Sequence, residues 1–116
     1  MSSTLRPLGY MIVTSPGSLI RATHGQADPA FAYPAHAFMV QAGPSNVGKC
    51  YVGLAGFSRL DATGAGLLAV IAVPTINTIP AFSVTIAYAM AALNMADIWI
   101  DADNANDRVL ITAVVG

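Results

Sequence analysis

The sequence predicts an all-β fold, a single-domain β-sandwich or jelly roll of about seven to eight short antiparallel strands. Proline and glycine recur at short intervals along the 116 residues, and the runs between them are rich in Val, Ile, Tyr, Phe and Thr, which favour strands. No window combines a helical period of apolar residues with charged residues on the opposite face. The length fits one core, so we expect residues 1–116 to form one domain.

The first part of the chain contains one short strand candidate and a long irregular segment. Residues 10–14 are strand-like, whereas residues 15–34 have little periodicity and contain several glycines and prolines. We therefore expect residues 1–34 to be partly an extended N-terminal arm or loop, and residues 35–116 to form the core of the sandwich.

The remaining strand candidates follow at turn-separated intervals. They are residues 35–42, 49–54, 67–73, 82–90, 95–102 and 108–115. Two apolar runs, residues 67–73 and 87–93, are equally compatible with short buried helical turns, because alanine favours a helix and a continuous apolar run does not discriminate.

The clearest strand covers residues 95–102, where one face is apolar and the other is mostly polar. The apolar face holds Ala96, Ile98, Ile100 and Ala102, and the opposite face holds Asp97, Trp99 and Asp101. A polar stretch, residues 103–107, follows, and a β-branched run resumes at residues 108–115. Asp and Asn favour tight turns. The two runs are therefore expected to pair as a hairpin.

The composition indicates that other protein covers much of this domain. Five basic and six acidic residues, 11 in all, are the only charged ones among 116, and 55% of the residues are hydrophobic. A small domain exposes a large share of its surface and normally covers it with charged side chains. No apolar stretch approaches the ~20 residues that a membrane helix requires. We therefore expect burial against protein neighbours and no membrane contact.

Four residues of the expected hairpin are candidates for that protein interface. Leu110 and Val114 share a strand face with Arg108, and Trp99 lies opposite the apolar face of its own strand. Tryptophan is enriched at interface hot spots. The alternative is that Trp99 belongs to the core and the alanine-rich face points outward, and the sequence leaves both interpretations open.

Two glycine-rich runs resemble nucleotide-binding motifs but lack essential parts. Residues 43–50 match a phosphate-binding loop except for Cys50, a poor Mg²⁺ ligand, and a strand rather than a helix follows. Residues 64–69 match a dinucleotide fingerprint, yet no acidic residue occurs between Asp61 and Asp97. Both runs are interpreted as turns, and no cofactor is expected.

No other pattern indicates catalysis, metal binding or nucleic-acid binding. The acidic cluster at residues 97–107 departs from the EF-hand spacing and is interpreted as a solvated turn. His24 and His36 stand in no catalytic context, so we do not expect an enzyme. The basic residues are scattered singly, which argues against nucleic acid. Cys50, the only cysteine, is expected to be a small apolar strand residue.

Two segments resemble small tailed-bacteriophage virion proteins. These segments are S-N-V-G-K-C-Y-V-G at residues 45–53 and A-D-I-W-I-D-A-D at residues 96–103, the latter followed by Asp107 and Val109. The virion proteins carry an N-x-G-x-x-Y-V-G strand and a late D-x-Y-I/V-D-A strand, so Trp99 takes a place more often held by Tyr. The resemblance covers about the C-terminal two-thirds of the chain.

The resemblance implies a β-sandwich or jelly-roll protein of the virion and carries over no catalytic residue. We expect a capsid cement or decoration protein, made in the bacterial cytoplasm, that binds the phage major capsid protein on the capsid exterior as a homo-oligomer, dimeric or trimeric. The alternative is a head-fibre or tail adhesin that recognises a cell-surface glycan through exposed aromatic side chains.

Overall fold

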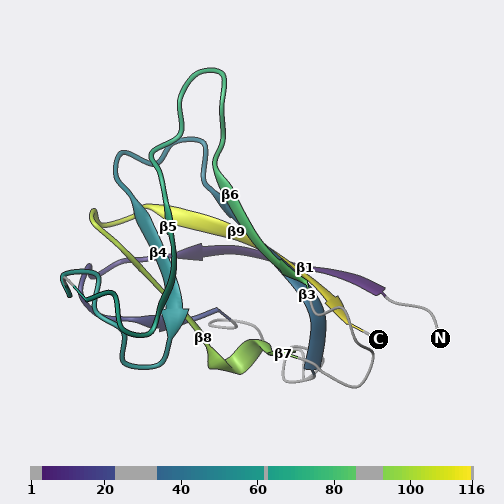
Figure 1. Cartoon of the computed structure of the whole chain (residues 1–116). Coiled ribbons are helices and arrows are strands. Elements are labelled where there is room, and N and C mark those ends of the chain that lie inside the picture. Colours follow the sequence, from purple (N-terminus) through teal and green to yellow (C-terminus); the bar gives the residue numbers. More distant parts are fainter. Residues whose placement is uncertain (1–3, 23–33, 62, 86–92, 116) are drawn as a thin grey trace.

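In the computed structural model, two antiparallel β-sheets pack face to face (Figure 1). The structure describes residues 4–22, 34–61, 63–85 and 93–115. Within these ranges every strand pair is antiparallel, and the one helical element is a single 3-10 turn. The predicted all-β sandwich is confirmed.

Nine strands lie in the described residues, two of them only two residues long. They are β1 (Thr4–Ile12), β2 (Ile20–Arg21), β3 (Pro34–Ala42), β4 (Cys50–Leu54), β5 (Leu67–Ile71), β6 (Ala81–Thr85), β7 (Leu93–Asn94), β8 (Ile98–Ala102) and β9 (Arg108–Val115), with the 3-10 turn η2 (Met95–Asp97) before β8. Sheet A has the order β1-β9-β3-β6, with β7 also pairing with β3, and sheet B has the order β2-β8-β4-β5.

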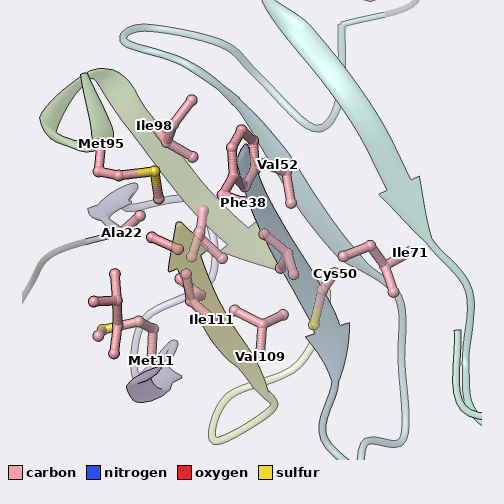
Figure 2. Close-up of a cluster of buried hydrophobic side chains, with 14 of the residues drawn as sticks. Met11, Ala22, Phe38, Cys50, Val52, Ile71, Met95, Ile98, Val109 and Ile111 are labelled. Atoms are coloured by element: carbon pink, nitrogen blue, oxygen red, sulfur yellow. The ribbon is translucent and has the colours of Figure 1, made fainter. Parts of the chain in front are cut away.

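The core lies between the two sheets and draws on both of them (Figure 2). Alternate residues of the long strands point inward, as in β9, where Val109, Ile111 and Ala113 are all buried. Sheet B contributes Ile98, Ile100 and Ala102 of β8, which are also buried. Burying one such aliphatic side chain contributes roughly 1.5–3 kcal/mol, so this shared core is the main stabilising element of the sandwich.

The N-terminal segment belongs to the sandwich to a greater extent than the sequence predicts. Strand β1 begins at Thr4 rather than at residue 10, pairs along its length with β9, and buries Leu8 and Met11. Sequence patterns miss it because Pro7 and Gly9 interrupt the run. At an edge strand a proline is tolerated, and the ladder shifts register between these two residues, with Gly9 at φ 85°.

The expected loop at residues 15–34 is also partly ordered into the sandwich. Ile20 and Arg21 form β2 and pair with Ile100 and Trp99 of β8, and the next residue, Ala22, is fully buried. The expectation of an arm or loop is therefore wrong for residues 4–9 and 20–22, whereas residues 13–19 do form a loop, and residues 23–33 lie outside the described residues.

The expected hairpin of residues 95–102 and 108–115 does not form. Strand β8 pairs with β4 and β2 in sheet B, whereas β9 lies between β1 and β3 in sheet A. Residues 103–107 therefore cross from one sheet to the other, and residues 95–97 form η2 instead of strand. Of the two orientations that the sequence left open for residues 95–102, the structure has Ile98 and Ile100 pointing inward.

The other strand predictions are close to the observed elements. Residues 67–71 form β5, so the helical alternative for this run is wrong. Strand β6 covers the first part of the candidate at residues 82–90, and residues 86–92, which include most of the second helical alternative, lie outside the described residues. The loop of residues 72–80 that joins β5 to β6 is closed by a 2.8 Å hydrogen bond from Thr75 N to Thr78 O.

Candidate protein-binding surface

The outer face of sheet A is formed largely by uncharged side chains. Register places Leu110 of β9 between Tyr10 of β1 and Gln41 of β3, and it places Val114 between Leu5 and Ala37. We call this surface the outer A face, and it consists of Leu5, Pro7, Tyr10, Ile12, Ala37, Met39, Gln41, Ser83, Arg108, Leu110, Thr112 and Val114.

Large apolar side chains on the outer A face are open to solvent. Leu5 is 70% exposed, and Tyr10, Ile12 and Met39 are between 38% and 46% exposed. A hollow of ≈ 220 Å³, lined almost wholly by apolar atoms, lies at the end of the face that holds Leu5 and Val114. Monomeric proteins seldom leave a contiguous apolar face of this kind uncovered, so the outer A face is a candidate for protein contact.

The one charged residue of the outer A face is partly engaged within it. The guanidinium carbon of Arg108 lies 5.9 Å from the centroid of the Tyr10 ring, which places the cation over the aromatic face. A second hollow of ≈ 220 Å³ is lined by these two residues with Pro44 and Ser45, and its lining is more polar than that of the first.

Trp99 lies on the other side of the molecule. It belongs to β8 of sheet B and points away from the core, because it is half-buried whereas Ile98 and Ile100 beside it are buried. The Arg21 guanidinium carbon, from the paired strand β2, lies 4.8 Å from its ring centroid. Trp99 is therefore not a core residue, and it shares no patch with Arg108, Leu110 and Val114. Its interface role stays a prediction.

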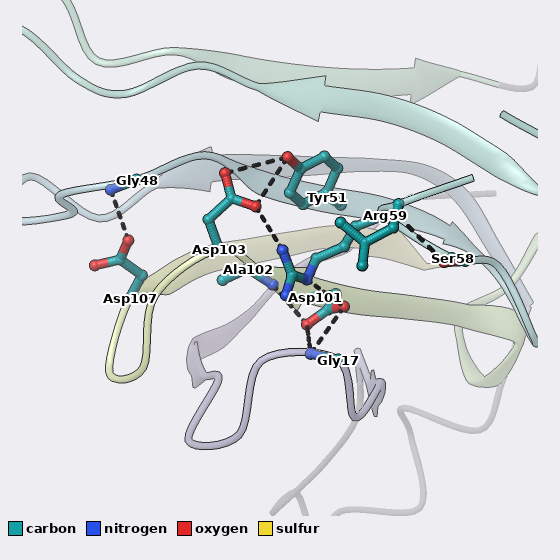
Figure 3. A network of polar contacts seen from close by, with 10 residues as sticks. Gly17, Gly48, Tyr51, Ser58, Arg59, Asp101, Ala102, Asp103 and Asp107 are labelled. Atoms are coloured by element: carbon teal, nitrogen blue, oxygen red, sulfur yellow. Dashed lines mark hydrogen bonds and ion pairs between the residues drawn. The ribbon is translucent and has the colours of Figure 1, made fainter. Parts of the chain in front are cut away.

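A network of polar side chains covers the outer face of sheet B (Figure 3). Arg59, from the loop after β4, donates from Nη1 to Asp103 at 2.9 Å, and its Nε lies 3.4 Å from a carboxylate oxygen of Asp101. Tyr51 donates its hydroxyl to Asp103 at 3.0 Å. Burial, and then the bond to Asp103, raises the pKa of Tyr51 above its usual value. The network ties this loop to β4 and to the end of β8.

Asp101 is the buried centre of that network. It is 1% exposed, although strand alternation places it on the outer face. Its carboxylate accepts hydrogen bonds from the backbone N–H of Gly17, at 3.0 and 3.2 Å, and from that of Ala102, at 2.8 Å. Asp101 is thus shielded from solvent by the loop between β1 and β2 and by the Arg59 side chain. Sequence reasoning missed this network, because nothing local links Gly17, Arg59 and Asp101.

The loop that resembles a phosphate-binding loop binds a carboxylate of its own chain. The backbone N–H groups of Val47 and Gly48 donate to the two oxygens of Asp107, at 3.1 and 2.8 Å. Next to them, Asn46 donates from its side chain to the carbonyl of Arg108 at 2.8 Å and accepts from the Arg108 N–H at 2.9 Å. These bonds fasten the β3–β4 loop to the start of β9, and strand β4 follows the loop, as the turn interpretation requires.

The glycine run at residues 64–69 is likewise a turn that leads into a strand. Gly64 and Gly66 have φ of 68° and 80°, which side chains rarely adopt, and Leu67 begins β5 immediately afterwards. Gly66 accepts a 2.8 Å hydrogen bond on its carbonyl from the N–H of Leu54. The glycines therefore supply the positive φ values that this turn requires.

The interpretation of the acidic cluster as a solvated turn is wrong for two of its members. Asp101 and Asp107 are 1% and 4% exposed, and both hold backbone N–H groups of distant loops. Within the described ranges, no group of three or more His, Cys, Asp or Glu side chains is arranged to hold a metal ion. Asp101 and Asp107 of the cluster instead hold loops of their own chain in place.

Cys50 is buried in the core, and its burial makes the free energy of unfolding depend on pH in the alkaline range. Burial, and then the negative charge of Asp107, raises the pKa of its thiol from 9.0 to about 12. The folded state thus favours the protonated thiol, so this contribution is complete below pH 9 and is lost as the pH rises towards 12. We expect urea unfolding to show a loss of about 1.4 kcal/mol per pH unit from this thiol above pH 9.

Comparison of Cys50→Ala with the parent chain isolates that loss. Both proteins should carry Tyr51→Phe, because the pKa of Tyr51 is also raised in the folded state. The alanine protein should show a shallower decline of unfolding free energy with pH. Equal slopes would mean that the Cys50 thiol does not couple to folding.

Comparison with known proteins leaves the family of the chain open. No family model matches the sequence, and no curated protein matches it significantly. Among the described residues, no helix has the length and apolar character needed to span a membrane. The assignment of a function therefore depends on the surfaces described above.

Proposed function

We propose that the chain is a capsid cement or decoration protein of a tailed bacteriophage, which binds the assembled major-capsid lattice from outside and stabilises it. The outer A face is the observation that carries this proposal. It presents Leu5, Tyr10, Ile12 and Met39 to solvent on a broad sheet surface, with Arg108 as its one charged residue. Such a face fits the flat surface of a protein shell better than a small-molecule site, which is concave.

Stabilisation of the shell would follow from mass action. A protein that binds the assembled shell but not its separated subunits shifts the equilibrium by RT ln(1 + [L]/Kd), about 2.7 kcal/mol at a hundredfold excess over Kd. Since the outer A face is apolar, attachment should depend weakly on ionic strength, because salt screens charges and not apolar contacts. Particles that release the protein readily in concentrated salt would contradict this contact surface.

A charge placed on the outer A face tests the proposal. Met39→Asp puts a carboxylate at the middle of the face, at a position 38% exposed, so the domain should stay folded while its occupancy on particles falls at least about tenfold. The control is Leu60→Asp, which makes the same kind of change at a 77% exposed position in the loop after β4. Occupancy is measured as the mass-spectrometric ratio of this chain to the major capsid protein in purified particles.

Full occupancy of the Met39→Asp protein would overturn the proposed contact surface.

A second candidate function, glycan recognition by a head-fibre or tail adhesin, is favoured by the hollow beside Tyr10, where an aromatic ring lies next to Ser45 and Arg108. Copy number separates the two functions. A cement protein occurs in proportion to the capsid lattice, whereas an adhesin occurs in a few copies at the tail or fibres.

A further inference from the structure

One long stretch of the sequence carries no charged residue. No Asp, Glu, Lys or Arg occurs between Asp61 and Asp97, and this stretch includes β5, the loop of residues 72–80 and β6. Strand β5 ends sheet B and β6 ends sheet A, so these two sheet edges are uncharged. Exposed edges are normally protected by charged residues or prolines, because they offer unpaired backbone groups to other strands.

Strand β5 is the less protected of the two. Among the described strands it pairs with β4 alone, and residues 67–71, L-L-A-V-I, contain neither a proline nor a charge. Its one irregularity is a register shift at Leu67, so the pairing is regular from Ala69 to Ile71. Leu68 and Val70 are 43% and 49% exposed.

Hydrogen bonding in sheet B shows which backbone groups of β5 face outward. Asp103 donates its N–H to the carbonyl of Lys49 at 3.0 Å, which continues the β4–β8 register, so residues 49, 51 and 53 turn their backbone groups towards β8. Cys50 and Val52 therefore turn towards β5 and bond their partners there, Ile71 and Ala69.

Val70, between those two partners, consequently directs its N–H and C=O away from β4. Its backbone groups lie at the open edge of sheet B, and its side chain stands on the outer face, opposite Tyr51 of β4. A strand that approaches this edge would bond Val70 first.

We propose that the β5 edge pairs with the β5 edge of a second copy of this chain, antiparallel about a two-fold axis at Val70. The two four-stranded B sheets then form one continuous sheet. A second copy is the partner that fits, because this edge is complementary to itself. In the antiparallel arrangement Val70 meets Val70 of the other copy and Leu68 meets Ala72, with no like charges to repel one another. Two-fold dimers are also the commonest symmetric assemblies.

This dimer does not depend on the proposed capsid function, because it uses sheet B and leaves the outer A face free. The test is made on the purified chain without particles, by sedimentation and native mass spectrometry. The parent chain should be a dimer. Val70→Lys and Val70→Asp should each dimerise at least about 100-fold more weakly, because two like charges then face each other at the axis. Leu60→Lys, the same kind of change at an exposed position away from the edge, should remain a dimer.

Mixing the two charged variants gives the decisive result. If residue 70 of one copy lies opposite residue 70 of the other, a mixture of Val70→Lys and Val70→Asp should form a heterodimer, because opposite charges then meet at the axis. Its mass distinguishes it from either homodimer. A parent chain that is monomeric at every soluble concentration, a dimer that survives Val70→Lys, or a mixture that stays monomeric would each overturn the proposal.

Proline substitutions separate edge pairing from contact through side chains. Val70→Pro removes an N–H that does not take part in the β4 ladder, so the domain should stay folded while the dimer is lost. Ala69→Pro removes the bond to Val52 and should destabilise the domain itself. A dimer that persists in folded Val70→Pro would exclude backbone pairing at this edge.

Discussion

Replacement of Asp101 with alanine should lower the free energy of unfolding by about 3–5 kcal/mol. The carboxylate is 1% exposed, holds the N–H of Gly17 and lies 3.4 Å from Nε of Arg59. Without it, the Gly17 N–H loses its acceptor, and the loop between β1 and β2 loses its fastening to sheet B. The Arg59 guanidinium also loses a buried counter-charge. Urea unfolding of the purified domain measures the difference, with an unchanged slope showing that the denatured state is unaffected.

Asp103→Ala is the matched control for that experiment. Its carboxylate bonds the same Arg59 and also Tyr51, but the side chain is 35% exposed. Exposed ion pairs contribute little, so we expect a loss below about 1 kcal/mol. Equal losses for Asp101→Ala and Asp103→Ala would mean that burial of the Asp101 carboxylate does not determine its contribution.

Replacement of Asp107 with alanine should be the second large loss, about 2–4 kcal/mol. This residue is 4% exposed, and its two oxygens accept the N–H groups of Val47 and Gly48. The alanine protein leaves both N–H groups without their acceptor and loosens the loop before β4. Asp107→Asn keeps one acceptor oxygen and should fall between the parent and the alanine protein in urea unfolding. An asparagine protein as unstable as the alanine protein would show that the charge, and not the count of acceptors, dominates.

The strands and the alternation of their two faces could largely be predicted from the sequence, because alternation is a local signal. Val109 and Ile111 share one face of β9 and are buried, whereas for β8 the alternation was predicted but not which of its two faces, that of Ile98 and Ile100 or that of Trp99, points inward. The outer face of β9, with Leu110, was also visible as a surface with too few polar residues. Composition alone indicated exposed apolar surface, and the outer A face has it.

Strand pairing could not be predicted, because it depends on contacts between residues far apart in the chain. The polar stretch at residues 103–107 has the composition of a hairpin turn, yet Asn and Asp serve a crossing between sheets equally well. What selects the crossing is Asp107, which bonds Val47 and Gly48, together with Asn46, which bonds both backbone groups of Arg108. No local sequence pattern predicts these hydrogen bonds.

The same reason separates Trp99 from the rest of the predicted surface. The predicted interface grouped Trp99 with Leu110 and Val114, but β8 and β9 belong to different sheets. Burial of Asp101 was equally invisible, since Arg59 and Gly17 cover it from loops distant in sequence. Strand β1 was missed because Pro7 is compatible with a strand only at a sheet edge, and the edge is a property of the fold.

The position of β9 has a consequence for how the chain folds during synthesis. This strand lies between β1 and β3 in sheet A, yet it is made after every other described strand. Among the described strands β1 pairs with β9 alone, so β1 stays unpaired during synthesis until residues 108–115 leave the ribosome. Pairings between such distant segments form slowly, and unpaired apolar strands are prone to aggregate meanwhile. We expect sheet A to close only after translation has passed β9, so ribosome-bound chains arrested before it should be sensitive to protease.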